Sequence, residues 1–185
     1  MKGAWIENKT LYDGTQLRSG WVKSQTRLAG SAIASFAGPA DVPIENMVDL
    51  EDVAANAPIF SNEMLHFIAE HEERDLPLAV ARQRLLVAIA AEEIVGRAPS
   101  ARIERKGDDI YEGDRKLSVS IATSSPRSTL IHFAINIRSD GTPVPTKGLS
   151  DYGIDPRTLA DSILKRYCAE IESMEKATKK VRPVD

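Results

Sequence analysis

The spacing of hydrophobic residues predicts short extended segments over the first forty residues of the chain. Two of them flank Asp13-Gly14, a dipeptide suited to a tight turn, and so predict a small hairpin within residues 1–20. A short strand follows at 31–37 and stops at the chain breaker Gly38-Pro39. The acidic segment 44–53 mixes helical and irregular spacing, which indicates a loop and then a short helix.

Helical spacing characterises the next segments. Ser61 is a suitable N-cap for a helix over 62–73, with Glu63 in the first turn, where the helix dipole favours a negative charge. The segment 75–94 repeats leucine, alanine and isoleucine at helical spacing, which predicts a second helix buried on most sides. One of its arginines needs a carboxylate or phosphate partner, because a charge in an apolar helix is costly to bury alone.

From residue 102 to 137 the period falls to two, which predicts a run of strands. The predicted strands lie near 100–105, 109–112, 115–123 and 129–138. Asp155-Pro156 opens a last amphipathic helix, since proline is tolerated at the first helical position. Strands, then helices, then strands and a helix predict an α+β fold, with helices packed on a mainly antiparallel sheet.

Length and charge narrow the class of protein. The 185 residues fit a single domain over 1–175 with a basic tail at 176–185. The net charge of -3 argues against a general electrostatic hold on nucleic acid or on an anionic membrane. The single cysteine excludes an intrachain disulfide. The chain shows no apolar run typical of a secretion signal or a membrane span, so we expect a cytoplasmic protein.

One face of the last two predicted strands is neither apolar nor conventionally solvated. Sorting by parity places Leu117, Val119 and Ile121 on the core side, with the isoleucines and Phe133 of the partner strand. The other side carries Lys116, Ser118, Ser120, Ala122, Leu130, His132, Ala134 and Asn136. A hairpin symmetric about Pro126 would place Ser120 near His132 and Lys116 near Asn136. Small residues around a few polar groups indicate the floor of a ligand pocket, or else a sheet face covered by a loop.

Two further clusters carry weaker signals. His66, Glu70 and His71 fall on the predicted helix 62–73, where a boundary position is favoured over a metal site because His71 is rotated away from the other two. The acidic residues of 45–52 either bind a cation, line the mouth of the pocket or are simply solvated.

Part of the chain resembles a known ligase motif. The stretch "DDIYEGDRKLS" resembles the biotin and lipoate protein ligase pattern, in which Asn-Asp-(Leu/Ile) precedes Lys-(Ile/Leu)-(Ala/Ser)-Gly. Asp108 falls on the asparagine of that pattern, Asp109 on its aspartate and Lys116 on its essential lysine. The stretch "HFAINIRSDGTPVP" is similar to a segment of the lipoate ligases and octanoyltransferases, and its His132, Asn136 and Asp140 match residue by residue.

Over its full length the chain also looks like a family of uncharacterised proteins. Its members share "GPADVPIENMVDLEDV", "RQRLLVAI", "KLSVSIAT" and "GTPVPTKGL". The resemblance implies the fold of the biotin and lipoate ligases, which is related to the cores of class II aminoacyl-tRNA synthetases. A shared fold does not fix the chemistry.

The resemblance implies an acyl ligase or transferase that activates a small carboxylate with ATP as an acyl-adenylate and passes it to a carrier protein. Lys116 would stabilise the developing charge as a cation. Ser118 and Ser120 would let the ligand approach, and His132 and Asn136 would position it. Asp109, with Asp108, would hold the nucleotide end and an oxygen-ligated Mg²⁺.

Three departures from the pattern motivate an alternative function. The glycine- and arginine-rich loop that closes over the adenylate has its nearest counterpart in "TRLAGSAIASFAGPAD", with Arg27 as its sole arginine. Val119 replaces the glycine after the lysine motif. No cysteine nucleophile follows the second block, and Cys168 lies on the apolar side of the last helix. The alternative is a non-catalytic protein that binds a small-molecule carboxylate or nucleotide. An edge strand also makes a homodimer plausible.

Overall fold

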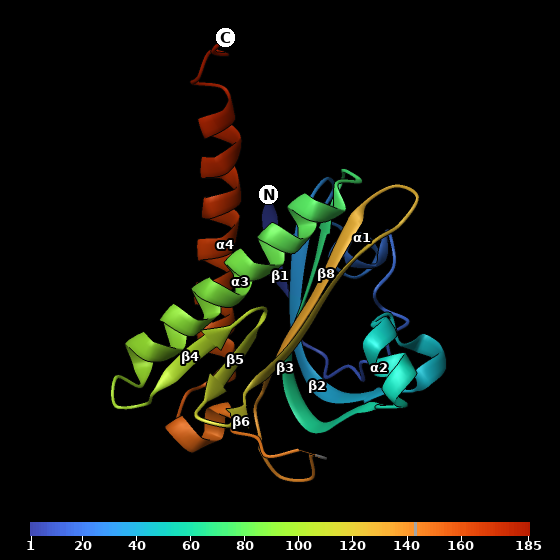
Figure 1. The fold of residues 1–185 in the computed structure, drawn as a ribbon, viewed down its shortest axis with the longest axis vertical. Helices are drawn as coiled ribbons and strands as arrows, with labels where there is room; N and C mark the ends of the chain where they lie inside the picture. Colours follow the sequence, from blue (N-terminus) through green and yellow to red (C-terminus); the bar gives the residue numbers. More distant parts are fainter. Residues whose placement is uncertain (143) are drawn as a thin grey trace.

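The structure, a computed structural model, describes residues 1–142 and 144–185. Its strands form a five-stranded sheet in the order β1-β2-β3-β8-β7 and a three-stranded sheet in the order β4-β5-β6 (Figure 1). Paired strands are antiparallel except for β1 and β2. The strands are β1 (Lys2–Trp5), β2 (Ala32–Val42), β3 (Ile59–His71), β4 (Ile103–Lys106), β5 (Asp109–Glu112), β6 (Arg115–Lys116), β7 (Ser118–Ser124) and β8 (Thr129–Asn136).

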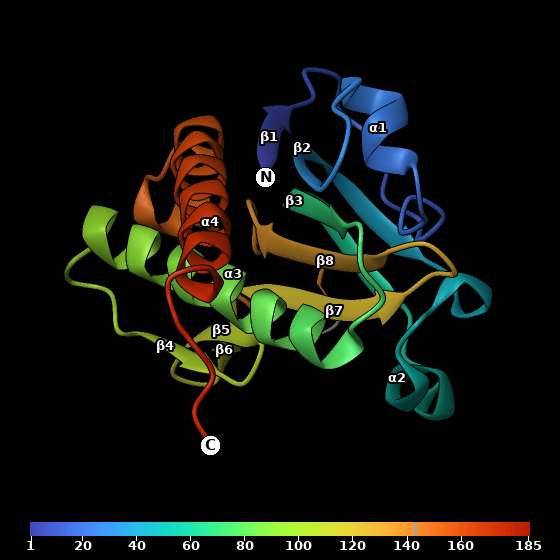
Figure 2. The ribbon, with the colours of Figure 1, turned by 90° about the horizontal axis from the view of Figure 1, so that it is seen from above.

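Helices cover the two faces of the large sheet unequally. The helices are α1 (Trp21–Thr26), α2 (Leu50–Ala55), α3 (Leu76–Arg97) and α4 (Pro156–Thr178), with 3-10 turns at Ile44–Asn46 and Leu149–Tyr152. The long helices α3 and α4 lie on one face, and the short α1 lies on the other (Figure 2). The predicted α+β class with a mainly antiparallel sheet is confirmed. Among the described helices, none combines the length and apolarity that a bilayer crossing requires.

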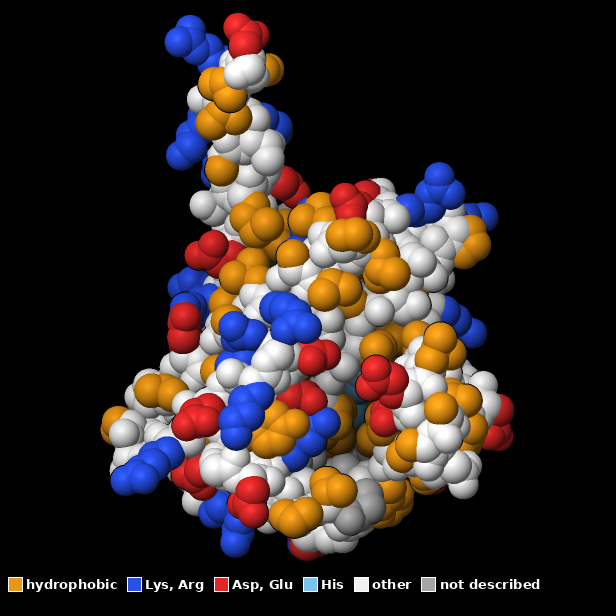
Figure 3. All heavy atoms as spheres, in the orientation of Figure 1, with side chains coloured by type: hydrophobic (Ala, Val, Ile, Leu, Met, Phe, Trp, Pro, Cys, Tyr) orange, Lys and Arg blue, Asp and Glu red, His pale blue; other side chains and the backbone are white. Residues whose placement is uncertain are grey.

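The two long helices begin where the sequence predicts. The Asp75 carboxylate accepts a hydrogen bond from the backbone N–H of Leu78 at 3.0 Å, and Asp155 caps α4 in the same way through Thr158 at 2.8 Å. Helix α4 continues through residues 176–178, so the predicted basic tail begins as helix. Its last turns stand clear of the body of the molecule (Figure 3).

The predicted need for a partner inside α3 is also met. Arg82 is buried and forms an ion pair with Glu73, whereas Arg84 is exposed. The apolar side chains around Arg82 join Phe67 and Phe133 of the sheet in the main core, which α4 closes from the outside.

The predicted N-terminal hairpin is wrong. Residues 2–5 pair in parallel with β2, from Lys2 opposite Ala32 to Trp5 opposite Ser35. The turn at Gly14 does form, with a positive φ of 89°, but it does not join two paired strands. Strand β1 also packs against α4, so its pairing with β2 is supported by a tertiary contact that a local hairpin would not have.

The predicted helix over 62–73 is instead the long strand β3. It lies between β2 and β8, and residues 64–71 are all buried. A strand buried on both faces is apolar at consecutive positions, so its period does not distinguish it from a helix. His66 and Glu70 consequently share one face of the sheet and His71 lies on the other, because successive side chains of a strand alternate.

Strand β2 does not stop at Gly38-Pro39 but continues to Val42, with an irregular pairing between Gly38 and Ala40. The N-terminal segment runs beside β2 at this point, with Tyr12 in a parallel bridge to Ala40. A Cβ on Gly38 would lie 1.9 Å from the backbone oxygen of Thr10. The backbone N–H of Tyr12 donates to the Pro39 carbonyl at 2.9 Å, and these contacts fix the backbone of Tyr12 beside β2.

We predict that Gly38→Ala destabilises the protein by about 2 kcal/mol or more, because the added methyl group meets backbone that cannot move aside. Gly96→Ala is the matched control, since a Cβ there meets nothing within 4 Å. Alanine in place of that helical glycine should raise stability by roughly 0.5–1 kcal/mol. Urea unfolding of both variants measures the effects. Equal stability of Gly38→Ala and the wild type would contradict the close approach of Gly38 to the backbone of Thr10.

Candidate functional site

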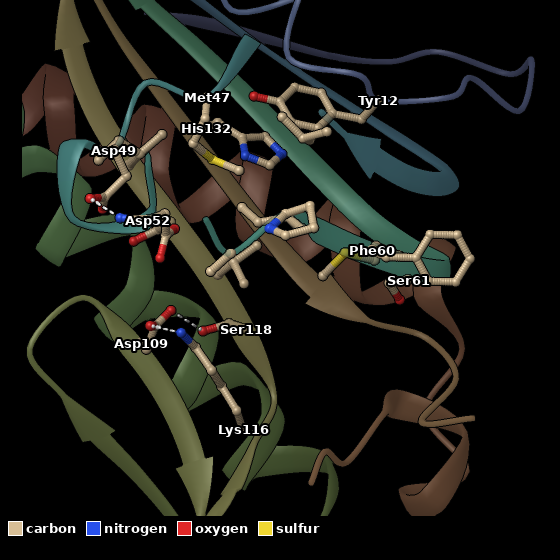
Figure 4. A pocket seen from close by; sticks show the side chains of 18 of the residues that line it. Tyr12, Met47, Asp49, Asp52, Phe60, Ser61, Asp109, Lys116, Ser118 and His132 are labelled. Carbon is tan, nitrogen blue, oxygen red and sulfur yellow. Dashed lines mark hydrogen bonds and ion pairs between the residues drawn. The ribbon is translucent and has the colours of Figure 1, made fainter. Parts of the chain in front are cut away.

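A cavity of about 540 Å³ lies over the face of the large sheet opposite α3 and α4. Strands β3, β7 and β8 form its floor, and the N-terminal segment, the α2 region and residues 142, 144 and 146 form its walls (Figure 4). Acidic side chains of the α2 region border the hollow in Figure 3. The residues that line this cavity include seven that the sequence singles out: Asp108, Asp109, Lys116, Ser118, Ser120, His132 and Asn136.

The predicted register of the β7–β8 hairpin is wrong by one residue. Ser120 lies opposite Phe133, and Ile121 lies opposite His132. The loop contains the four residues 125–128, so its centre falls after Pro126 rather than on it. A one-residue shift exchanges the faces of a strand. Val119 and Ile121, which were predicted to face the core, therefore line the cavity floor.

The hydroxyls of Ser118 and Ser120 consequently form hydrogen bonds with backbone groups at the start of the small sheet's strand β5. Ser118 Oγ accepts from the N–H of Ile110 at 2.8 Å and donates to Asp109 Oδ1 at 3.1 Å. Ser120 Oγ donates to the Asp108 carbonyl at 2.7 Å. Both hydroxyls thus hold the turn that carries the two aspartates against the cavity.

Lys116 lies at the charged end of the cavity. Its Nζ is 2.7 Å from Asp109 Oδ2, and about a third of its side chain is exposed. The contact with Asn136 is also present, because Asn136 Nδ2 donates to the Lys116 carbonyl at 3.3 Å. Asp140, in contrast, pairs with Arg138 at the surface and is not among the lining residues.

Electrostatics keep Lys116 charged. Burial alone would lower the pKa of Lys116, but the Asp109 carboxylate outweighs it and raises that pKa. Burial raises the pKa of Asp109, and the lysine opposes this effect. Burial and the nearby charge of Asp49 raise the pKa of Asp52 at the cavity mouth, with Lys116 again opposing. Four aspartates and one lysine line the cavity, and the described lining contains no arginine.

At the other end of the cavity, His132 pairs with the buried His66 behind it, a contact that sequence reasoning missed. The ring of Tyr12 stacks on His132 with centroids 3.7 Å apart, and His132 Nε2 lies 3.1 Å from Nδ1 of His66. Burial lowers the pKa of His66 to about 4 and that of His132 well below its ordinary range. Figure 4 shows Lys116 at one end of the cavity and His132 with Tyr12 at the other.

The remaining predicted candidates lie apart. Glu70 accepts hydrogen bonds from the hydroxyls of Ser19 and Ser128, and His71 lies 3.0 Å from the Tyr167 hydroxyl. They form no common metal site with His66, and within residues 1–142 and 144–185 no cluster of three metal-ligating side chains is found.

Ser61, predicted to cap a helix, also lines the cavity. Its Oγ is buried without a hydrogen-bond partner among the described residues. Cys168 packs against the main core and is not among the lining residues.

Comparison with protein families identifies the chain at the level of its family. A model described as a domain of unknown function, DUF366, matches residues 1–182. The chain belongs to this family. An uncharacterised protein of Methanocaldococcus jannaschii is 34% identical over 187 residues, covering 97% of this chain and 84% of the relative.

Solved structures give the DUF366 chain its place among known folds. A protein of unknown function from Pyrococcus horikoshi has a TM-score of 0.92 and 35% identity, with both chains fully covered. The biotin protein ligase of Aquifex aeolicus in complex with biotin and ATP has a TM-score of 0.61 and 15% identity, over 94% of this chain and 72% of the ligase.

A T. acidophilum protein provisionally assigned as a lipoate protein ligase, with bound lipoic acid, has a TM-score of 0.56 and 15% identity, over 92% of this chain and 86% of that one. At these identities the likeness to both ligases concerns the fold, which is ligase-like as the sequence predicts.

We predict that stability falls between pH 6.5 and pH 4, partly because His66 is buried neutral. The unfolded chain protonates this histidine below its ordinary pKa of 6.5, whereas the folded chain resists until about pH 4. This difference corresponds to roughly 3 kcal/mol, present in full above pH 6.5 and lost as the pH falls to about 4. Urea unfolding at several pH values should show that the free energy of unfolding of His66→Gln falls less steeply with decreasing pH than that of the wild type.

The variant His71→Gln is a second test and not a neutral control: burial, with a smaller effect of Arg82, lowers the pKa of His71 to about 3. It should therefore also lose stability less steeply, while the share of His66 and His132 stays in place. Identical pH dependence of the wild type and His66→Gln would show that His66 is not held neutral.

Proposed function

We propose that this chain binds a small carboxylic acid, or its adenylate, with the reacting carboxylate at Lys116. The observation that carries the proposal is the placement of Lys116 Nζ at the edge of a largely apolar cavity, held by Asp109 at 2.7 Å. A lysine kept protonated beside an apolar floor is suited to bind a carboxylate or a phosphate oxygen. The apolar part of the acid would lie on the side chains of Val119 and Met64.

We further propose that the bound acid is activated with ATP. In such a reaction a carboxylate oxygen attacks the α-phosphorus, and an acyl-adenylate and pyrophosphate form. The amine of an acceptor lysine then attacks the acyl carbon, an amide forms, AMP leaves, and the proton of the amine passes to solvent. Proteins of the same fold hold biotin with ATP or lipoic acid, which supports this choice of ligands. That the acceptor is a carrier protein stays a prediction. The same holds for the homodimer.

Mg²⁺ fits this site as a companion of the nucleotide. Mg²⁺ in nucleotide sites takes one or two carboxylates, and phosphate and water complete its shell. Asp109 is engaged by Lys116 and Ser118, whereas no hydrogen-bond partner of the Asp52 carboxylate is seen among the described residues. Asp49 accepts the N–H groups of Glu51 and Asp52 through Oδ1, and no hydrogen bond to its Oδ2 is found among the described residues. Asp52 and Asp49 would therefore hold the ion, which neutralises phosphate charge when bound. Burial and mutual repulsion raise the pKa of Asp52, and a cation would relieve both.

A specific observation also favours the non-catalytic alternative. The described lining sets four aspartates against one lysine and contains no arginine that could pair with a phosphate. A polyphosphate would therefore meet net repulsion here unless a cation accompanies it. A pocket of this charge could hold an acid at Lys116 without accepting ATP at all.

We predict that an acyl-sulfamoyl adenosine binds the wild type and binds Lys116→Ala about 10- to 100-fold more weakly, as expected for loss of a charge-assisted hydrogen bond. Lipoyl, biotinyl and octanoyl forms would be titrated calorimetrically. Lys106→Ala is the matched control, because Lys106 lies on β4 and is not among the lining residues. Pyrophosphate release from MgATP, dependent on the free acid, then separates the ligase from the binding protein. Failure of every analogue to bind would overturn the proposed function.

A further inference from the structure

The hydrogen bonds around His66 determine where each histidine carries its proton. His66 Nε2 lies 3.2 Å from the carbonyl oxygen of Gly38, which can only accept. His66 Nε2 must therefore carry the proton, and Nδ1 of the neutral ring has none. His132 Nε2 lies 3.1 Å from that bare nitrogen and must donate to it. Since His132 is also neutral, its own Nδ1 is left as a bare acceptor.

This acceptor belongs to the cavity. His132 and Tyr12 both line it, and their rings are stacked. His132 forms its one side-chain hydrogen bond through Nε2, and within the part of the chain that the structure describes no hydrogen bond to His132 Nδ1 or to the Tyr12 hydroxyl is found. The two side chains are only 3% and 4% exposed, so the groups are presented inside the site rather than at the surface.

The acceptor is far from the carboxylate position. Asn136 contacts the backbone of Lys116, and His132 lies four residues earlier on the same strand. At about 3.3 Å per residue, the two ends of the cavity are about 13 Å apart. An extended acid bound at Lys116 would bring its remote end to His132 and Tyr12.

We infer that the acid bound in this cavity carries a neutral hydrogen-bond donor, such as a hydroxyl, amide or urea group, at the end remote from its carboxylate. His132 Nδ1 accepts from that donor, and the Tyr12 hydroxyl supplies a second contact. His66 is a positioning residue, because it holds His132 in the tautomer that accepts. The inference rests on the proposed function and narrows its substrate class: a plain alkyl chain would leave the buried acceptor unpaired, which a site built for a polar group penalises.

The test compares ligands that differ at the remote end alone. Octanoyl and ω-hydroxyoctanoyl chains on the same sulfamoyl adenosine differ by one hydroxyl, and the biotinyl form presents two N–H groups. We expect the hydroxylated or the biotinyl form to bind the wild type about tenfold or more tightly than the octanoyl form.

Variants of the remote end should change the ratio of affinities rather than affinity in general. Tyr12→Phe keeps the stacked ring, and His132→Phe keeps a ring but removes the acceptor. In either variant the affinities for the polar and the alkyl analogues should become similar. A folding defect would instead weaken the binding of all analogues by the same factor. If the octanoyl form binds as tightly as the polar forms, and still depends on Lys116, the inference is overturned and the proposed function stands. If none of the three analogues binds, the inference and the proposed function are both overturned.

The proton positions can be measured without a ligand. Long-range nitrogen–proton correlation spectra distinguish the two neutral tautomers, and the chain has three histidines, so His71→Gln assigns the remaining signals. We expect His66 and His132 both to be neutral with the proton on Nε2 at pH 7. A His132 that carries its proton on Nδ1, or that is an imidazolium, would overturn the inference.

Discussion

At Gly38 the N-terminal segment lies against β2 so closely that a single methyl group would meet the backbone of Thr10. The contact holds Tyr12 beside β2, and its ring stacks on the ring of His132. The carbonyl of the same glycine faces His66 and so determines the hydrogen-bonding order of the histidine pair. One missing side chain therefore sets the shape of the wall, the position of the aromatic ring and the polarity of the remote end of the cavity. Because a bulkier residue would displace all three together, the architecture of this end depends on steric access more than on any single attractive contact.

The parts of the fold that were predictable from the sequence are those whose signals are local. The starts of α3 and α4 follow from an aspartate cap with a nearby proline, and both lie within a few residues of the helix that they begin. Strand β3 was not predictable in this way, because it is buried on both faces and its apolar run has no period of two. The pairing of β1 with β2 was hidden for a different reason: it joins residues about thirty positions apart, and it is supported by packing against α4.

In the candidate site, too, the contacts between residues close in sequence were predictable and the long-range contacts were not. Lys116 and Asp109 are close in sequence, and their motif places them together whichever way β7 is registered. The faces of Ser118 and Ser120 depended on the centre of the turn after β7, and a four-residue loop centred after Pro126, instead of a loop centred on Pro126, reversed them. Tyr12 and His66 could not be connected to His132 from the sequence, since they come from segments 54 or more residues apart along the chain. The predicted helix at 62–73 further concealed His66. The buried polar atoms of these residues were the signal, and only the assembled sheet makes them visible.

The charge balance of the cavity decides what each candidate function requires. Lys116 offers one positive charge, and Asp109 already neutralises much of it through a contact of 2.7 Å. A monocarboxylate can share that lysine, because it brings one charge and a chain that gains from the apolar floor. A triphosphate brings several negative charges into a site lined by four aspartates, so Coulomb repulsion at short range opposes its binding. The ligase therefore needs a divalent cation between the phosphates and Asp52, and its nucleotide binding must vanish when that cation is absent. A binding protein for the acid alone has no such requirement, so the same aspartates that make the ligase metal-dependent would protect the binding protein from occupation by ATP.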